Sequence, residues 1–137
     1  MENSRFKFRA WLKNRIELCK VLSIHFGKTT IVISVQDGVG KTWFELGNEN
    51  AELMQYTGLK DKNGVEIYEG DIVRFEAIEW TGNNGDRVEY QGVVEYSEEH
   101  IAFSYKLPTG LEAIPYESTN IEVIGNIYEN PELLGVK

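Results

Sequence analysis

Residues 53–75 constrain the fold most, because they place two turn signals between three apolar runs. The dipeptide Asn63-Gly64 is favoured in type I′ turns, whose two central residues both need positive φ. A second turn signal at residues 69–71, Glu-Gly-Asp, precedes a run in which apolar and polar residues alternate. That alternation is the pattern of a half-buried strand. The stretch therefore predicts antiparallel strands joined by tight turns, and its Tyr-x-Gly-Asp-x-Val segment is typical of small SH3-like barrels.

The residues before this stretch predict a small antiparallel sheet. Residues 5–13 alternate between apolar and polar side chains, which favours a strand with one buried face. Residues 18–26 and 29–35 are rich in β-branched residues and are separated by Gly27-Lys28, which predicts a hairpin. Together these segments predict a three-stranded sheet.

The residues after this stretch predict a series of hairpins. Residues 72–96 form the first, with a five-residue loop at 81–85, and residues 101–116 form the second, with Pro115 limiting its last strand to an edge. A strand at residues 121–128 then completes the sheet. Alternation places one apolar set in a shared core, namely Val73, Phe75, Val94, Phe103, Val123 and Ile127.

The expected fold is mainly β. It consists of an N-terminal antiparallel sheet in residues 1–50 and a small SH3-like β-barrel in residues 51–137. A single continuous domain is the alternative, because 137 residues lie within the size of one domain.

Three ordered motifs also resemble one family. They are Tyr-Thr-Gly-Leu-Lys-Asp at 56–61 with Gly64 and Ile-Tyr-Glu-Gly-Asp-Ile-Val at 67–73, Phe-Arg-Ala-Trp at 8–11, and Ile-Glu-Val-Ile-Gly-Asn-Ile-Tyr-Glu-Asn-Pro-Glu-Leu-Leu at 121–134. With these motifs spread over nearly its whole length, the chain resembles the YopX family of phages and prophages of Gram-positive bacteria. It departs from that family at Leu12-Lys13, where an acidic residue commonly follows the Ala-Trp pair. The resemblance implies a phage-encoded, mostly β protein of unassigned biochemical role, and it transfers no catalytic residue.

The charges divide the chain into two halves. Residues 1–44 carry eight Lys and Arg against three Asp and Glu, a net charge of +5, while residues 45–137 carry six against nineteen, a net charge of −13. The total of −8 argues against a protein that wraps nucleic acid over its whole surface. It leaves open an acidic protein that imitates nucleic acid and inhibits a host protein, or an acidic surface that serves solubility alone.

The basic half offers the best candidate binding site. In the alternating run near the N-terminus, the side chains of Arg5, Lys7, Arg9 and Trp11 share one face. They could neutralise phosphates and stack on a base, as small β surfaces do with single strands. The alternative is a solvated edge strand whose Lys and Arg side chains discourage pairing with other chains.

No motif of an enzyme or a metal site stands out. Gly-Lys-Thr at 40–42 resembles the end of a phosphate-binding loop, but that loop needs a glycine where Val35 lies, so a turn built on Asp37-Gly38 is the better interpretation. Cys19 is the single cysteine, and neither His25 nor His100 has ligand partners nearby in the sequence. We therefore predict no enzymatic activity, no metal and no cofactor.

The predicted function is that of a phage or prophage accessory protein that is not an enzyme and acts by macromolecular binding or assembly. The alternatives are a nucleic-acid-binding module that uses the basic N-terminal strand, and an acidic inhibitor of a host protein. The expected partners are a second copy of the chain and a host or phage protein, and nucleic acid stays open. A strand with Phe6, Phe8 and Leu12 on one face would be a poor free edge, which predicts self-association through this segment.

The predicted location is the cytoplasm of the bacterial host. No apolar run approaches the roughly 18 residues that a membrane span requires, so no membrane partner is expected. The first residues are polar and charged and do not resemble a secretory leader.

Overall fold

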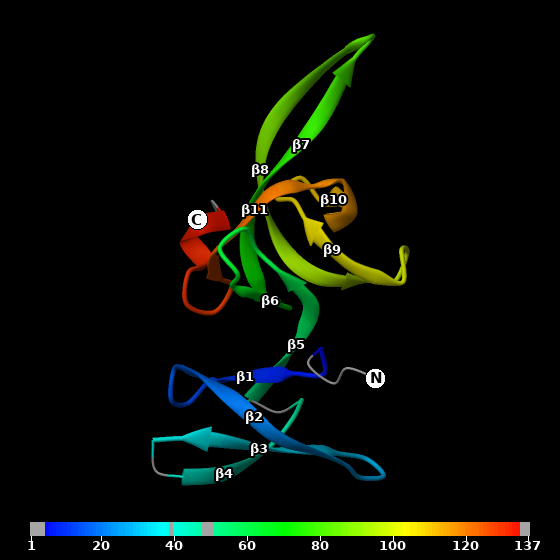
Figure 1. The fold of residues 1–137 in the computed structure, drawn as a ribbon. Helices are drawn as coiled ribbons and strands as arrows, with labels where there is room; N and C mark the ends of the chain where they lie inside the picture. Colours follow the sequence, from blue (N-terminus) through cyan, green and yellow to red (C-terminus); the bar gives the residue numbers. More distant parts are fainter. Residues whose placement is uncertain (1–4, 39, 48–50, 135–137) are drawn as a thin grey trace. The chain divides into compact units, whose positions relative to one another are not determined.

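The computed structural model describes residues 5–38, 40–47 and 51–134 (Figure 1). In these residues the chain is mainly β, as predicted, with two short 3-10 helices and no α-helix. It divides into two compact units, the first ending at Tyr56 and the second beginning at Thr57. The boundary therefore falls within a strand, whereas the sequence suggested a division after residue 50. No helix in the described ranges has the length and apolar character needed to cross a membrane.

The first sheet has the strand order β4-β3-β2-β1-β5-β6. Its first five strands in the chain are β1 (Phe8–Leu12), β2 (Glu17–Phe26), β3 (Ile31–Asp37), β4 (Gly40–Glu45) and β5 (Ala51–Lys60). The predicted antiparallel pairing of β1 with β2 and of β2 with β3 is confirmed, but the sheet has more than the three predicted strands, because β4 pairs with β3 and β5 pairs with β1. Residues 40–42 begin β4, which pairs antiparallel with β3 after a tight turn. Residues 40–42 are therefore strand and not turn, whereas Gly38, of the predicted Asp37-Gly38 turn, does lie in a turn after β3.

β1 is an inner strand of this sheet. It pairs antiparallel with β2 on one side and with β5 on the other. The alternative of a solvated edge strand is therefore wrong for residues 8–12, and the free edge from which we predicted self-association is already paired. Alternation within one segment cannot reveal this pairing, because three strands separate β1 from β5 along the sequence.

The core of the first unit lies on one face of the sheet. Its buried cluster consists of Ala10, Leu12, Cys19, Ile33, Val35 and Ala51. This confirms that Ala10 and Leu12 face a core and that Cys19 is a buried strand residue. We call the opposite face of β1–β4 the outer face.

The loop between β5 and β6 (Glu66–Tyr68) contains the predicted Asn63-Gly64 turn. The N–H of Gly64 donates to the carbonyl of Asp61 at 3.0 Å, and the N–H of Asp61 donates to the carbonyl of Val65 at 2.8 Å. Of the Asn63-Gly64 pair, only Gly64 has a positive φ, +83°. The tight turn is confirmed, but its type differs from the prediction, because a type I′ turn needs positive φ at both central residues.

The second sheet has the strand order β10-β9-β8-β7-β11. Its strands are β7 (Asp71–Thr81), β8 (Asn84–Ser97), β9 (Ala102–Lys106), β10 (Glu112–Ala113) and β11 (Thr119–Asn126), and the 3-10 helices η1 (Pro115–Glu117) and η2 (Pro131–Leu134) follow β10 and β11. Two antiparallel sheets are therefore confirmed. β10 and β11 end the second sheet, and no pairing joins them in the part of the chain that the structure describes, so a closed SH3-like barrel is not confirmed.

The core of the second unit contains part of the apolar set that the sequence predicted. Its buried cluster is Ile67, Val73, Phe75, Val94 and Tyr105, with Val123 packed against it. Burial of Val73, Phe75 and Val94 is confirmed, and Val123 is partly buried. Phe103 and Ile127 lie outside this cluster, and the Phe103 ring instead meets the half-exposed ring of Tyr96 edge-on at 5.9 Å. Alternation continues along a strand past the point where its core ends, so it overestimates burial there.

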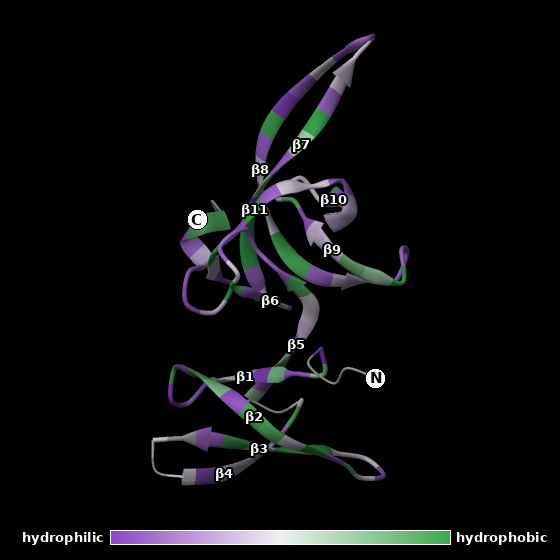
Figure 2. Cartoon of the chain, in the orientation of Figure 1, coloured by the Kyte–Doolittle hydropathy of each residue, from purple (hydrophilic) through white to green (hydrophobic). Residues whose placement is uncertain are grey.

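β7 and β8 extend beyond the rest of their sheet as a two-stranded arm (Figure 1). β11 pairs with β7 only as far as Glu76, and β9 pairs with β8 only from Val93 onward. Within the described residues, the strand pairing of the arm, residues 77–88, is confined to its own two strands. Its turn at residues 82–83 is shorter than the predicted loop at 81–85. Both strands of the arm carry hydrophobic segments among hydrophilic ones (Figure 2).

Candidate functional site

The four predicted site residues do not form one open face. Arg5 and Lys7 are exposed and precede β1. Arg9 is half-buried within β1, and Trp11 is buried, with only 7% of its surface exposed. The Trp11 ring is therefore not accessible for the predicted stacking, although Arg9 does share its side of β1.

A row of cationic side chains crosses the outer face of the first sheet. In the strand register, Lys20 on β2 lies opposite Arg9 on one side and opposite Gln36 on the other, and Gln36 lies opposite Lys41. Directly opposed residues of antiparallel strands share a face. Arg9, Lys20, Gln36 and Lys41 thus form one row across β1, β2, β3 and β4, which we call the basic row.

Two cations of the basic row are open to solvent. Lys20 and Lys41 are exposed, and within the described residues neither ammonium group makes an ion pair or a hydrogen bond. Arg9 and Lys20 are like charges placed directly opposite each other, an arrangement that is unfavourable in a sheet. Local arrangements that cost stability are expected at functional sites. The basic row is therefore a better candidate than the N-terminal run by itself.

An aromatic side chain lies beside the basic row. Trp43 follows Lys41 by two residues on β4, so it shares the outer face, and 49% of its surface is exposed. The Lys41 ammonium lies 4.8 Å from the centre of the Trp43 ring, and the His25 ring centre lies 5.0 Å away, tilted by 54°. His25 is held by a chain of contacts, because its Nε2 is 3.2 Å from Ser23 Oγ, which is 2.5 Å from Ser34 Oγ.

The sequence contained a signal for this site that local reasoning missed. Lys41 and Trp43 alternate on β4, but that stretch was considered only as a candidate phosphate-binding loop. Their grouping with Lys20 also depends on a register shift between Val21 and Ser23 in the β2–β3 pair. Such a bulge changes which residues of β2 share a face, and alternation alone cannot place it.

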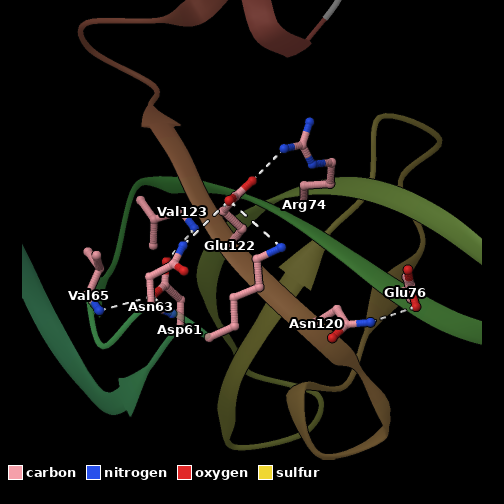
Figure 3. Close-up of polar contacts among 9 residues, drawn as sticks. Asp61, Asn63, Val65, Arg74, Glu76, Asn120, Glu122 and Val123 are labelled. Atoms are coloured by element: carbon pink, nitrogen blue, oxygen red, sulfur yellow. Dashed lines mark hydrogen bonds and ion pairs between the residues drawn. The ribbon is translucent and has the colours of Figure 1, made fainter.

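In the second unit, the polar residues of the family-like motifs hold loops in place (Figure 3). The Asp61 carboxylate is almost fully buried and accepts hydrogen bonds from the backbone N–H groups of Asn63 at 2.8 Å, Val65 at 2.9 Å and Val123 at 3.0 Å. Burial by itself would raise the pKa of Asp61, but these three donors and the nearby charge of Lys62 lower it below its usual value. Asp61 is thus kept as an anion with a structural role.

Glu122, next to Val123 on β11, is the centre of an ion-pair cluster (Figure 3). Its carboxylate accepts a hydrogen bond from Arg74 on β7, and it lies 3.8 Å from the Lys62 ammonium. The hydrogen bond from Arg74 and the charge of Lys62 lower the pKa of Glu122. This cluster joins the β5–β6 loop, β7 and β11.

Two further buried polar residues, which lie opposite each other in the β7–β11 pair, stabilise the loops beside them. Asp71, which is 1% exposed, accepts a hydrogen bond from the N–H of Tyr68 at 2.8 Å. The Asn126 side-chain oxygen accepts from the N–H groups of Tyr128 at 3.0 Å and Glu129 at 2.9 Å. The motif residues therefore supply turn chemistry, since their polar atoms are engaged with the backbone.

The structure brings Glu112 close to His100 and to its sequence neighbour Glu99. Ligand atoms of Glu99, His100 and Glu112 lie within 4.8 Å of one another, and all three residues are exposed. His100 Nε2 is 3.3 Å from the Glu112 carboxylate, which also accepts a hydrogen bond from Ser97 Oγ at 2.8 Å. The expectation that His100 is isolated is therefore wrong, because Glu112 comes from the neighbouring hairpin. We assign this exposed ion-pair geometry no ligand.

The chain is similar to a known structure over nearly all of its length. The crystal structure of protein EF1440 from Enterococcus faecalis has a TM-score of 0.61 and 28% sequence identity, and the match covers 93% of this chain and 96% of that chain. No curated protein matches the chain significantly. Residues 7–135 match the family described as YopX protein, a range that contains all three of the motifs quoted above. The chain therefore belongs to the YopX family.

Proposed function

We propose that the protein is not an enzyme and acts by binding nucleic acid through the outer face of its first sheet. The observation that carries this proposal is the basic row, in which exposed Lys20 and Lys41 are aligned with Arg9 across neighbouring strands. Neighbouring strands lie about 4.8 Å apart, so Lys20 and Lys41 stand roughly 10 Å apart. A line of separated cations suits a ligand with repeated negative charges.

The overall charge of the chain limits where such a ligand binds. Residues 57–137 carry six Lys and Arg against sixteen Asp and Glu, a net charge of −10 that repels a polyanion, whereas residues 1–56 carry eight against six, a net charge of +2, with +5 in residues 1–44. Nucleic acid would therefore meet the first unit in preference to the second. This explains how a chain with a total charge of −8 can have a local site for phosphates.

The roles of the buried polar residues support binding rather than catalysis. Asp61, Asp71 and Asn126 are the buried residues in the family-like motifs that offer acidic or amide groups, and each accepts backbone hydrogen bonds. A catalytic acid or base needs a free position facing a substrate. These groups instead fix the conformation of the second unit.

Salt dependence tests this proposal. A labelled single-stranded oligonucleotide is titrated with the protein at several salt concentrations, and binding is followed by fluorescence anisotropy. We expect log affinity to fall linearly with log salt, as counterion release requires. The Lys20→Glu/Lys41→Glu variant should lose at least about tenfold in affinity, because two phosphate contacts become repulsive.

A matched control separates the basic row from net charge. The Lys60→Glu/Lys106→Glu variant changes the total charge equally, but both of its residues are exposed in the second unit. It should bind nearly as well as the wild-type protein. Absence of binding at low salt, or equal losses in the two double variants, would reject the basic row as the site.

A second function, inhibition of a host protein, is favoured by the charges on the arm. Glu79 lies directly opposite Asp86, and Glu76 lies directly opposite Glu89. By alternation the two pairs lie on opposite faces of the β7–β8 ribbon, and the exposed pair of Glu79 and Asp86 on the arm is an acidic spot that would suit a basic protein surface. Affinity capture from host lysate after nuclease treatment tests it. One host protein retained by the wild-type chain and lost by Glu79→Lys/Asp86→Lys would establish this function instead.

The wider setting of the protein is also part of this proposal. Family membership supports an accessory role in a phage or prophage, acting in the cytoplasm of the bacterial host. We retain self-association and SH3-like closure of the second sheet as proposals. Because β1 is an inner strand, any self-association would use a surface other than its edge. Sedimentation equilibrium over a range of concentrations tests self-association. Amide exchange at the edges of β10 and β11 tests closure of the second sheet.

A further inference from the structure

Trp43 is a large apolar side chain on the side of the sheet that faces away from the core. Its neighbour Phe44 packs against the buried cluster of the first unit, so alternation turns Trp43 to the outer face. The residue directly opposite Trp43 is Ser34, whose short side chain cannot cover the ring. About half of the Trp43 surface therefore remains exposed, 49%.

The Trp43 ring is held by its neighbours before any ligand arrives. The His25 ring lies on one side at 5.0 Å between centres, and the Lys41 ammonium lies 4.8 Å from the ring centre. His25 is itself fixed through Ser23 and the fully buried Ser34. A ring held in this way loses little conformational entropy on binding a planar ligand.

The position of β4 leaves the ring accessible. β4 is the end strand of the first sheet, and in the described part of the chain its outer edge pairs with no other strand. A ligand can therefore approach Trp43 from beyond the sheet edge and continue along the basic row. A single strand of nucleic acid carries a phosphate and a base in every nucleotide, so one such ligand can contact both the basic row and the Trp43 ring.

We propose that Trp43 is a stacking platform for an unpaired base, so that the ligand of the outer face is single-stranded nucleic acid. This inference rests on the proposed function and specifies its ligand. In a duplex both faces of each base are already covered, whereas an unpaired base can stack on an aromatic ring. Lys41, which lies over the ring in the free protein, is close enough to contact the phosphate beside a stacked base.

Phosphate chemistry next to the ring favours this ligand over an apolar protein surface. Lys20 and Lys41 would have to be desolvated beneath an apolar partner, which opposes binding. The backbone of nucleic acid instead supplies a negative charge for each base. Cations beside an exposed aromatic ring are the combination that single-strand-binding surfaces use.

Three ligands of equal length test the inference at one fixed salt concentration. They are a single-stranded oligonucleotide, the same backbone carrying abasic sites, and a duplex. We expect the wild-type protein to bind the single strand on the order of tenfold or more tightly than the abasic strand, because only the former can stack. It should also prefer the single strand to the duplex.

Variants assign this preference to Trp43. Trp43→Ala should bind the normal and abasic strands equally, while Trp43→Phe should keep part of the preference. Trp80→Ala is the matched control, because Trp80 is also exposed but lies on the arm of the second unit, and it should behave as the wild-type protein does. Circular dichroism and thermal melting confirm that each variant is folded.

The outcomes distinguish this inference from the proposed function. If the wild-type protein binds normal and abasic strands equally, and Lys20→Glu/Lys41→Glu weakens both, nucleic-acid binding stands and stacking on Trp43 is rejected. A preference for the duplex rejects the single-stranded ligand. If none of the three ligands binds, the proposed function fails together with this inference.

Discussion

The Asp61 carboxylate accepts a hydrogen bond from the backbone N–H of Val123 at 3.0 Å, across 62 positions of the sequence. The same carboxylate accepts from Asn63 and Val65 within its own loop. Glu122, the neighbour of Val123, contacts Arg74 on β7. The β5–β6 loop is thus tied to β11, and β11 to β7, by side chains that come from two separate sequence motifs.

Replacing Asp61 by alanine should destabilise the second unit. The substitution removes all three acceptor contacts and leaves at least the Val123 N–H without its partner. We expect a loss of about 1–3 kcal/mol in the free energy of unfolding, measured by urea denaturation. Asp86→Ala is the control, because Asp86 is exposed and should change stability by less than about 0.5 kcal/mol. Equal effects of the two substitutions would contradict the structural role of Asp61.

Stability should also fall in acid because of Asp61. Its pKa is lower in the folded chain than the usual 3.8, so the folded state favours the anion. This contribution is fully present above the usual pKa and is lost as the pH falls through the lowered folded value. The stability difference between the wild-type protein and Asp61→Asn should therefore shrink below about pH 4. A difference that stays constant between neutral and acidic pH would contradict this linkage.

Replacing Gly64 by alanine isolates the strain of the turn. Gly64 has a φ of +83°, and a Cβ added there meets no atom within 4 Å. The cost should come from backbone conformation alone, roughly 1–2 kcal/mol for a left-handed residue. Gly38→Ala provides the comparison, since Gly38 has equal space and no positive φ. Thermal melting should rank Gly64→Ala clearly below Gly38→Ala, and the reverse order would contradict this turn geometry.

Tyr105 should make stability sensitive to alkaline pH. Burial raises the pKa of Tyr105 to about 12, and its hydroxyl has no hydrogen-bond partner in the described residues. Above the usual pKa of 10.0 the unfolded chain loses this proton while the folded chain retains it, so the contribution of Tyr105 falls between about pH 10 and 12. Tyr105→Phe should remove that decline.

The same substitution should cost little at neutral pH. A phenylalanine keeps the ring contact with Phe75, whose centre lies 5.1 Å away, and removes a buried hydroxyl that lacks a partner. We expect a change within about 1 kcal/mol, in either direction, by urea denaturation. A larger loss would show that the Tyr105 hydroxyl makes a stabilising contact.

Local sequence signals predicted the strands and turns well. Alternation identified β1, β2, β3 and the buried side chains of Val73 and Phe75, because a strand exposes every second residue to one face. Glycine and asparagine marked the turn at residues 63–64, since few residues tolerate positive φ. These features depend on neighbours in the chain and are therefore visible in the sequence.

The candidate site depended on relations that local signals do not contain. Pairing of β1 with β5 buried the strand that was predicted to bind, and the bulge in β2 aligned Lys20 with Gln36 and Lys41. Both follow from strand order and register between distant segments. Trp11 was therefore chosen as the stacking residue, although Trp43 is the exposed aromatic residue beside the basic row.

The arm formed by residues 77–88 can unfold cooperatively by itself, as a part smaller than either compact unit. Within the described residues its strands pair only with each other, and Ala77 at its base packs against the second core, so the part of the arm beyond Ala77 can open without exposing Phe75. Its amide protons should exchange with solvent through local opening, at a free energy well below that of global unfolding. A protease should likewise cut first at the turn at residues 82–83. The two fragments should then stay associated through the pairing of the remaining strands of the sheet.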